Sequence, residues 1–319
     1  MVLTCPFSPR FGVGVLLVGT LLLGCATPIE RRELAQEYFN LGNAYFELQD
    51  YERSYLYYRR AIDLSDDIPA AGFNLARLHL ERSEHEAALE VLERLLERDP
   101  ENALVLETRA YAFYLHGDAD RARREYRGLL DRPSVRRRVA FNLGLLEMNE
   151  GRYDEAVSVL EEYLEFVEDD REYRWLLAEV YYRAGQEEEA LNELEYYRSL
   201  AGVDPKPLSA LAVRYVDWEY FLLALDVLDL LSPEVLREPE PAWAQAQALL
   251  RGSGEFEPGM EALERALRGG FDDGEAIHRL LPHLREDERT LLLELVAEYN
   301  VSMPGDPEDE PPDPEEEDE

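Results

Sequence analysis

Apolar residues in the stretch 37–64 recur with the spacing of two amphipathic helices. Four residues at i, i+3, i+4 and i+7 share one face of the first helix: Tyr38, Leu41, Gly42 and Tyr45. Ser54, Tyr58 and Ala61 repeat this spacing on a second helix. Between them, residues 48–51 supply a turn. The pattern therefore predicts a helix–turn–helix pair.

The same pattern returns every 34 residues. FNLG stands at residues 39–42 and at 141–144, and FNLA stands at 73–76. Steps of 34 connect small residues at one position of each unit: Gly42, Ala76, Ala110, Gly144, Ala178, Ala212 and Ala246. A second small position keeps the same step: Ser54, Ala88, Ala122, Ala156, Ala190 and Ala224. Small side chains let paired helices approach closely, whereas leucine there would overpack the contact.

This period resembles the tetratricopeptide repeat, whose units are 34 residues long. The stretch EYFNLGNAYFELQDYERSYLYYRRAIDL is similar to the family consensus. Repeats are predicted to begin near residues 35, 69, 103, 137, 171 and 205. A degenerate seventh begins near 239, where the RGSGEFEPG loop (251–259) shifts the second helix by about one residue.

The resemblance implies an all-α fold, a right-handed superhelical solenoid of about seven helix–turn–helix repeats over residues 35–270. Single repeats cannot bury their apolar face, so neighbours must stack. Residues 271–300 do not follow the 34-residue period, and we expect them to form helices that cap the end of the core.

In this family the first helix of each repeat lines a concave groove that binds extended peptides or partner helices. By repeat position, the groove of this chain is predicted to be lined by aromatic and polar side chains: Phe39, Asn43, Phe46, Phe73, Asn74, Arg77, Tyr111, Tyr114, Phe141, Trp175, Glu179 and Tyr182. Aromatic residues are frequent binding hot spots. The competing interpretation is that they pack against adjacent repeats.

One kind of ligand is not expected. Some members of the family clamp a peptide's C-terminal carboxylate with two asparagines and three basic residues. Asn43 and Asn74 match the asparagines, but Phe39, Leu104 and Thr108 stand at the basic positions. Without cations this arrangement lacks the charge-assisted hydrogen bonds that hold a carboxylate.

An uncharged, mostly apolar run, FGVGVLLVGTLLLG, fills residues 11–24. It is shorter than the roughly 20 residues of a membrane-spanning helix and suits the apolar region of a secretory signal. The run ends in LLGC (22–25), which resembles the lipobox of bacterial lipoproteins, although Leu23 replaces the more usual small residue. The alternatives are an uncleaved anchor or a buried cysteine.

The lipobox resemblance implies that residues 1–24 are a signal peptide and that Cys25 is acylated. Residues 25–34 are then a lipid-anchored linker, and the membrane is reached through the lipid. Ala26, and not an aspartate, follows the cysteine. By resemblance to enterobacterial lipoprotein sorting, this implies a place at the outer membrane, facing the periplasm.

Catalytic chemistry has little support. Cys5 precedes the predicted cut and Cys25 would carry lipid, so no thiol remains for a disulfide, a metal or a nucleophile. HEAAL at 85–89 begins like a zinc-protease helix but lacks the second histidine. The chain contains neither GxSxG nor GxxxxGK[ST]. We therefore expect a protein that is not an enzyme and needs no cofactor.

The net charge of −36 would repel a phosphate backbone, so nucleic acid is not an expected partner. Within this acidic chain, eight arginines form a basic island: Arg121, Arg123, Arg124, Arg127, Arg132, Arg136, Arg137 and Arg138. The island either compensates neighbouring carboxylates or docks an acidic partner, lipid headgroups or the chain's own tail. Residues 301–319 are predicted to be that tail, disordered because it is rich in proline and acidic residues.

These inferences favour a non-enzymatic scaffold or adaptor at the bacterial cell envelope, which holds a protein or peptide partner in its groove. The alternative is an accessory lipoprotein of a transporter, which holds a small molecule. A closed, dry apolar cavity would favour the alternative, and an open aromatic groove would favour the scaffold.

Overall fold

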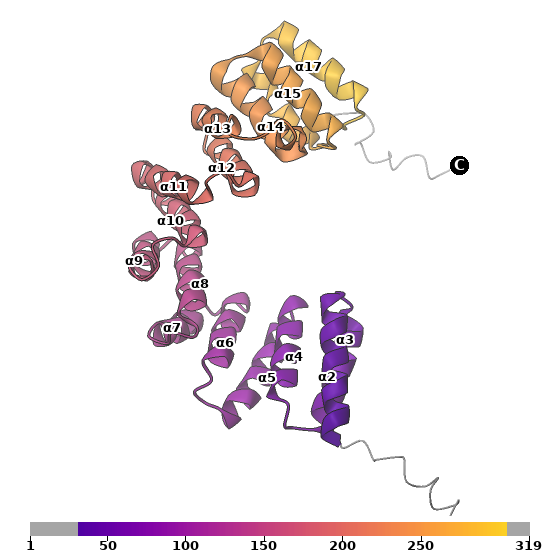
Figure 1. The fold of residues 1–319 in the computed structure, drawn as a ribbon, viewed down its shortest axis with the longest axis vertical. Helices are drawn as coiled ribbons and strands as arrows, with labels where there is room; N and C mark the ends of the chain where they lie inside the picture. The colour runs from indigo at the N-terminus through magenta and orange to yellow at the C-terminus, as the bar shows by residue number, and fades with distance from the viewer. Residues whose placement is uncertain (1–30, 305–319) are drawn as a thin grey trace, which may run out of the picture. The chain divides into compact units, whose positions relative to one another are not determined.

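The computed structural model describes residues 31–304, and the regular structure in that range is entirely helical (Figure 1). It contains sixteen α-helices, which confirms the predicted all-α repeat fold. The predicted signal peptide, Cys25 and residues 305–319 lie outside the described residues. None of the helices within 31–304 has the length and apolar content needed to cross a membrane.

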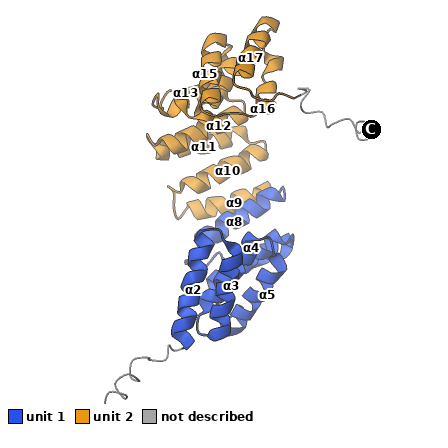
Figure 2. Ribbon diagram, turned by 90° about the vertical axis from the view of Figure 1, so that its right-hand side faces the viewer, with its two compact units in different colours: residues 1–152 blue, residues 153–319 orange. Residues whose placement is uncertain are grey.

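The chain divides into two compact units at Arg152 and Tyr153 (Figure 2). Unit 1 contains seven α-helices within residues 31–152: α2 (Arg31–Glu47), α3 (Tyr51–Leu64), α4 (Pro69–Glu81), α5 (His85–Arg98), α6 (Ala103–Leu115), α7 (Ala119–Leu129) and α8 (Arg136–Asn149). These helices stack in pairs, with α2 and α3 at one end (Figure 1). Arg31–Leu34, assigned above to the linker, belong to α2, because Leu34 continues its apolar stripe.

Unit 2 contains nine α-helices within residues 153–304: α9 (Tyr153–Leu164), α10 (Arg171–Arg183), α11 (Glu187–Ala201), α12 (Pro205–Asp217), α13 (Phe221–Leu228), α14 (Pro239–Gln247), α15 (Phe256–Arg268), α16 (Gly274–His278) and α17 (Glu286–Glu298). Short 3₁₀ turns occupy Val235–Arg237 and Leu281–His283. The first helices of successive repeats thus begin at or within one residue of the positions predicted from residue 69 onward.

Small residues hold the paired helices together. Every member of the two small series is buried, and most are fully inaccessible to solvent. In the first pair the Ser54 hydroxyl donates to the Gly42 carbonyl oxygen at 2.9 Å, so the two small positions meet. A Cβ added at Gly42 would overlap the ring of Tyr58. Close helix approach at these positions therefore follows from the sequence period.

The turns within the repeats share a backbone conformation that favours glycine. Six residues spaced 34 apart have a positive φ: Gln49 (58°), Ser83 (59°), Gly117 (89°), Gly151 (72°), Gly185 (76°) and Glu219 (64°). Glycine adopts this left-handed conformation without the Cβ clash that other residues meet. Half of these turns therefore carry a side chain in an unfavourable conformation.

Replacing Ser83 by glycine should stabilise the protein. The left-handed conformation costs an L-residue about 1–2 kcal/mol, which glycine avoids. Glycine also gives the unfolded chain more conformational entropy, and this offsets roughly 0.5–1 kcal/mol of the gain in stability. We expect S83G to raise the free energy of unfolding by up to about 1 kcal/mol, measured by urea denaturation with circular dichroism. G117S, the reverse change at the same repeat position, should lower it, and two shifts of the same sign would contradict this account.

The extra residue of the seventh repeat is accommodated by a π-helix. A π-helix at Ala248–Ser253 continues α14, and the left-handed turn follows at Gly254 (φ 72°) instead of at residue 253. A π-helical turn accommodates one inserted residue within a helix. This places the second helix of the repeat one residue late, as the sequence analysis expects.

A continuous apolar cluster joins the C-terminal helices to the last repeat. Ile277, Leu284 and Leu292 pack with Leu263 and its neighbours. Met303, in the stretch assigned above to a disordered tail, is 9% exposed in the same cluster. Packed structure therefore extends through Met303, beyond the boundary expected at residue 300.

Candidate partner-binding groove

Unit 1 contains a hollow of about 460 Å³ between α4, α6 and α8. We call it the α4–α6–α8 groove. Its walls combine apolar, polar and charged side chains: Phe73, Arg77, Leu80, Glu81, Leu104, Glu107, Thr108, Tyr111, Arg138, Asn142 and Leu145. All come from the first helices of three successive repeats, which is the surface that the sequence analysis assigned to binding.

The groove lining follows the 34-residue period. Most of its residues fall on four repeat positions: Phe73 with Glu107; Arg77 with Tyr111 and Leu145; Leu104 with Arg138; Thr108 with Asn142. Residues three, four and seven apart share one face of a helix. Each first helix therefore presents the same face to the groove.

Polar groups along the groove are partly engaged with one another. The Arg138 guanidinium donates to Glu107 Oε2 from Nε at 3.2 Å and from Nη2 at 3.1 Å. The Thr108 hydroxyl donates to the Leu104 carbonyl oxygen at 2.8 Å. The Arg77 guanidinium lies 5.4 Å from the centre of the Phe46 ring. The groove thus offers apolar surface beside charged side chains and the Asn142 amide.

The groove brings together three of the predicted site residues, namely Phe73, Arg77 and Tyr111. The sequence did not identify the remaining lining residues as part of the groove. Stepping by 34 from Phe73 and Arg77 would have found Glu107 and Leu145.

The two predicted asparagines serve contacts between repeats. Asn74 Nδ2 donates to Asn43 Oδ1 at 2.8 Å, and the Tyr58 hydroxyl donates to the same oxygen at 2.8 Å. These hydrogen bonds connect α2, α3 and α4. Both asparagines thus fix the spacing of the first two repeats, with Asn43 Oδ1 accepting two hydrogen bonds.

The other predicted residues of unit 1 lie mainly against neighbouring side chains. The Phe39 ring centre lies 6.1 Å from that of Tyr58. The Tyr114 ring lies 6.4 Å from Tyr111, and its hydroxyl accepts from Asn149 Nδ2 at 2.7 Å. Phe141 is half-buried on α8. Phe39 therefore contributes packing between α2 and α3, and Tyr114 contributes a contact between α6 and α8.

Trp175, Glu179 and Tyr182 belong to unit 2, where they form a separate aromatic cluster. The Tyr182 ring stacks on Trp218 with centres 4.0 Å apart and planes 5° apart. Arg214 lies 5.1 Å from the Trp175 ring centre, and its Nη1 lies 3.0 Å from Glu179 Oε2. Trp218 ends α12 and gives no periodic signal, so the sequence did not identify it.

The basic island is largely a set of ion pairs. Arginines of the island lie within 4 Å of a carboxylate in five cases: Arg121 with Asp118, Arg123 with Asp120 and Glu147, Arg127 with Glu147, Arg132 with Glu101, and Arg138 with Glu107. This favours local charge compensation over the docking of a partner.

Tyr126 lies fully buried on α7, and burial raises the pKa of its phenol well above the ordinary value, an effect to which the Glu107 carboxylate adds. The unfolded chain loses the Tyr126 phenol proton near pH 10, whereas the folded chain keeps it. Ionisation therefore favours the unfolded chain above pH 10, so the contribution of protonated Tyr126 to the free energy of unfolding is complete below pH 10 and is lost as the pH rises. We expect the unfolding free energy to fall less steeply above pH 10 in Y126F, by at most about 1.4 kcal/mol per pH unit. Denaturant titrations at several alkaline pH values measure the slope, and equal slopes would contradict the prediction.

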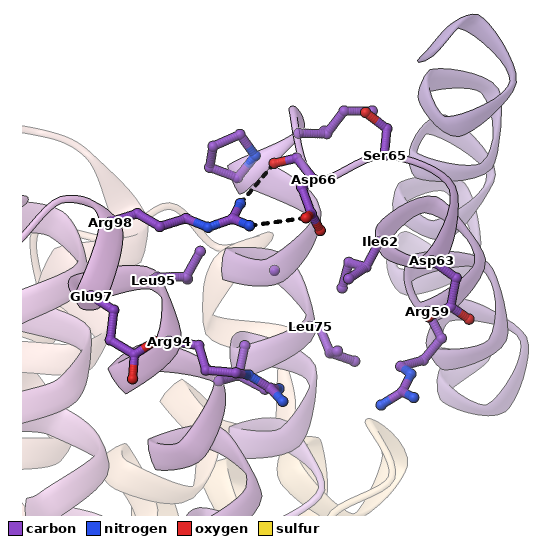
Figure 3. A pocket seen from close by; sticks show the side chains of 14 residues that line it. Arg59, Ile62, Asp63, Ser65, Asp66, Leu75, Arg94, Leu95, Glu97 and Arg98 are labelled. Carbon is purple, nitrogen blue, oxygen red and sulfur yellow. Dashed lines mark hydrogen bonds and ion pairs between the residues drawn. The ribbon is translucent and has the colours of Figure 1, made fainter. Parts of the chain in front are cut away.

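A second hollow of about 330 Å³ lies between α3, α4 and α5 (Figure 3). Arg98 at its edge binds Asp66, with Nη2 3.1 Å from the carboxylate and Nη1 donating to the carbonyl oxygen at 2.9 Å. Figure 3 shows Arg59 and Arg94 reaching toward the opening from opposite sides. This hollow includes second helices of two repeats, α3 and α5, whereas the α4–α6–α8 groove is lined by the first helices of three repeats alone, so we place the candidate site in that groove.

Two family models described as tetratricopeptide repeat match the chain. One matches residues 39–103, 73–134 and 107–170, and the other matches 147–212. A curated relative, an uncharacterized lipoprotein of Treponema pallidum, is 30% identical over 141 residues, which is 44% of this chain and 71% of the relative.

Two solved structures share the fold. A tetratricopeptide repeat protein of Parabacteroides merdae has a TM-score of 0.53 and 18% identity, covering 79% of this chain and 98% of that one. PilF of Pseudomonas aeruginosa has a TM-score of 0.51 and 19% identity, covering 73% and 99%. At these identities the similarity concerns the fold alone.

Proposed function

Because the chain belongs to the tetratricopeptide-repeat family, we propose that it is a non-enzymatic, lipid-anchored scaffold of the bacterial cell envelope. It holds an extended segment of a protein partner in the α4–α6–α8 groove. The lipid is attached at Cys25, and the outer membrane, facing the periplasm, is the proposed location. The proposal for Cys25 rests on the LLGC motif and on the similarity to a curated lipoprotein.

The groove itself carries the proposal for the partner. Solenoids present concave surfaces along which neighbouring repeats contact one extended ligand. The exposed Tyr111 ring and the apolar Phe73, Leu104 and Leu145 offer surface for side chains. Arg77 and Asn142 supply a donor and an amide beside them. An extended peptide matches this mixture because its polar backbone and alternating side chains face opposite walls.

A small-molecule role in transport receives less support. That role needs a dry apolar cavity, whereas four charged residues line the groove: Arg77, Glu81, Glu107 and Arg138. The scaffold is therefore the favoured function.

The test is chemical cross-linking in native membranes, followed by capture of the protein and mass spectrometry. A specific envelope protein should be captured with the wild-type chain and lost when Tyr111→Ala is combined with Arg77→Ala. Aromatic anchors commonly contribute 2 kcal/mol or more to an interface, so a loss of roughly thirtyfold or more is expected.

Tyr196→Ala provides a matched control, since Tyr111 and Tyr196 are both 37% exposed and only Tyr111 lines the groove. Capture should survive this change. Equal capture by both variants would reject the groove as the binding site. A bound small molecule in place of a protein would favour the transport role.

A further inference from the structure

The outward face of the first helix pair carries residue types that later repeats bury. Leu41 is 41% exposed, whereas Leu75, Leu143, Leu177 and Leu211, at the same repeat position, are at most 1% exposed. Tyr45 is half-exposed, and its equivalents Phe113, Tyr181 and Tyr215 are buried. In the later repeats of unit 1, the preceding helix pair covers this position. Within residues 31–304, the first pair has no such cover.

The residues of this surface form one aromatic and cationic patch, which we call the N-terminal face: Leu34, Tyr38, Leu41 and Tyr45 of α2, with Arg53, Tyr57 and Arg60 of α3. The Tyr57 ring stacks on Tyr38 at 5.9 Å and on Tyr45 at 5.3 Å. Arg60 lies 5.7 Å from the Tyr38 ring centre, and Arg53 lies 4.7 Å from that of Tyr45. Glu37 flanks the face, and Asp50 pairs with Arg53 at 2.7 Å.

Such a face is unusual for the end of a repeat stack. Terminal repeats normally carry a polar outer face, which keeps the stack soluble. Tyrosine suits a membrane surface because its ring is apolar and its hydroxyl is polar. Arginine guanidinium groups bind lipid phosphates, often with two hydrogen bonds. The composition of the N-terminal face therefore matches the headgroup region of a bilayer.

The acylation proposed for Cys25 would hold this face close to a membrane. Cys25 precedes Arg31 by six residues, which span at most about 20 Å when extended. We propose that the N-terminal face lies on the bilayer surface, with its tyrosines among the headgroups and Arg53 and Arg60 at lipid phosphates. The tether in this proposal rests on the acylation of Cys25 under the proposed function, whereas the chemistry of the face does not.

The experiment uses the full chain with Cys5→Ser, so that an added cysteine is the one thiol available for labelling once Cys25 is acylated. Leu41→Cys carries a fluorophore on the N-terminal face. Leu104→Cys, on α6 of the same unit and 42% exposed, is the matched control for Leu41, which is 41% exposed. Both proteins are placed in vesicles of phosphatidylethanolamine and phosphatidylglycerol, with and without headgroup nitroxide lipids. The probe at Leu41→Cys should lose most of its fluorescence to the nitroxide, and the control should retain it.

The outcomes separate the face from the anchor. Acylation of Cys25 is read from the mass of the mature chain. An acylated protein whose Leu41→Cys probe keeps its fluorescence overturns the membrane contact and leaves the anchor intact. A protein found unacylated refutes the anchor. Its Cys25→Ser form, in which the added cysteine is the one thiol, supports the face if added vesicles still quench the probe, and overturns the membrane contact if they do not. Quenching that depends on a second labelled copy and not on lipid overturns the proposal in favour of a contact between copies.

Discussion

Glu147→Ala should cost about 3–5 kcal/mol of stability, which is typical of removing one partner from a buried ion pair. Glu147 is inaccessible to solvent on α8. Arg123 Nε donates to both of its carboxylate oxygens, at 3.0 and 2.9 Å. Arg127 Nη2 lies 3.2 Å and Arg152 Nε 3.4 Å from the same carboxylate. Without the Glu147 carboxylate, the buried Arg123 keeps only the largely exposed Asp120 as an ion-pair partner among the described residues.

Urea denaturation of the full chain, followed by circular dichroism, measures this cost. Glu90→Ala, on the exposed face of α5, is the control and should change stability by less than about 0.5 kcal/mol. A similar small change for Glu147→Ala would mean that the ion pairs contribute little.

The repeat pattern suggests a rescue. Six repeats precede the degenerate seventh. At the position of Glu147, four of the other five carry aromatic residues, including Tyr45 and Tyr181, and the fifth carries a histidine. At the position of Arg123, the same five repeats carry Tyr55, Leu89, Val157, Leu191 and Leu225. Replacing both partners by well-packed apolar residues is often neutral or stabilising. We expect Arg123→Leu with Glu147→Tyr to recover most of the stability that Glu147→Ala loses.

Much of the fold could be predicted because the same helix contact recurs. Gly42, Ala76 and their equivalents mark the closest approach of two helices, so a step of 34 located α4, α6, α10, α12 and α14 to the residue. The burial of Met303 lacked such a signal. It depends on Gly274, which lies directly against the Ser302 carbonyl oxygen and leaves no room for a side chain.

The candidate site was predicted less completely, for a different physical reason. Repeat position tells which helix face a residue occupies, and it placed Phe73, Arg77 and Tyr111 on the groove side. It does not tell which neighbour a side chain contacts. Asn43 and Asn74 were expected at the groove, yet their amides bond each other and Tyr58. Such pairing depends on side-chain rotamers across two helices, which a one-dimensional pattern does not contain.

Ala156→Leu should lower the free energy of unfolding by about 1–3 kcal/mol, the usual cost of forcing extra methylene groups into a packed core. Ala156 has no exposed surface on α9 and belongs to the series of small residues that the repeat requires. The change keeps helix propensity nearly constant, so overpacking dominates the effect. Ala210→Leu, at an exposed position of α12 in the same unit, is the matched control and should have little effect. If thermal and urea denaturation gave equal stabilities for the two variants, Ala156 would not be at a close helix contact, and the spacing of 34 would reflect ancestry more than packing.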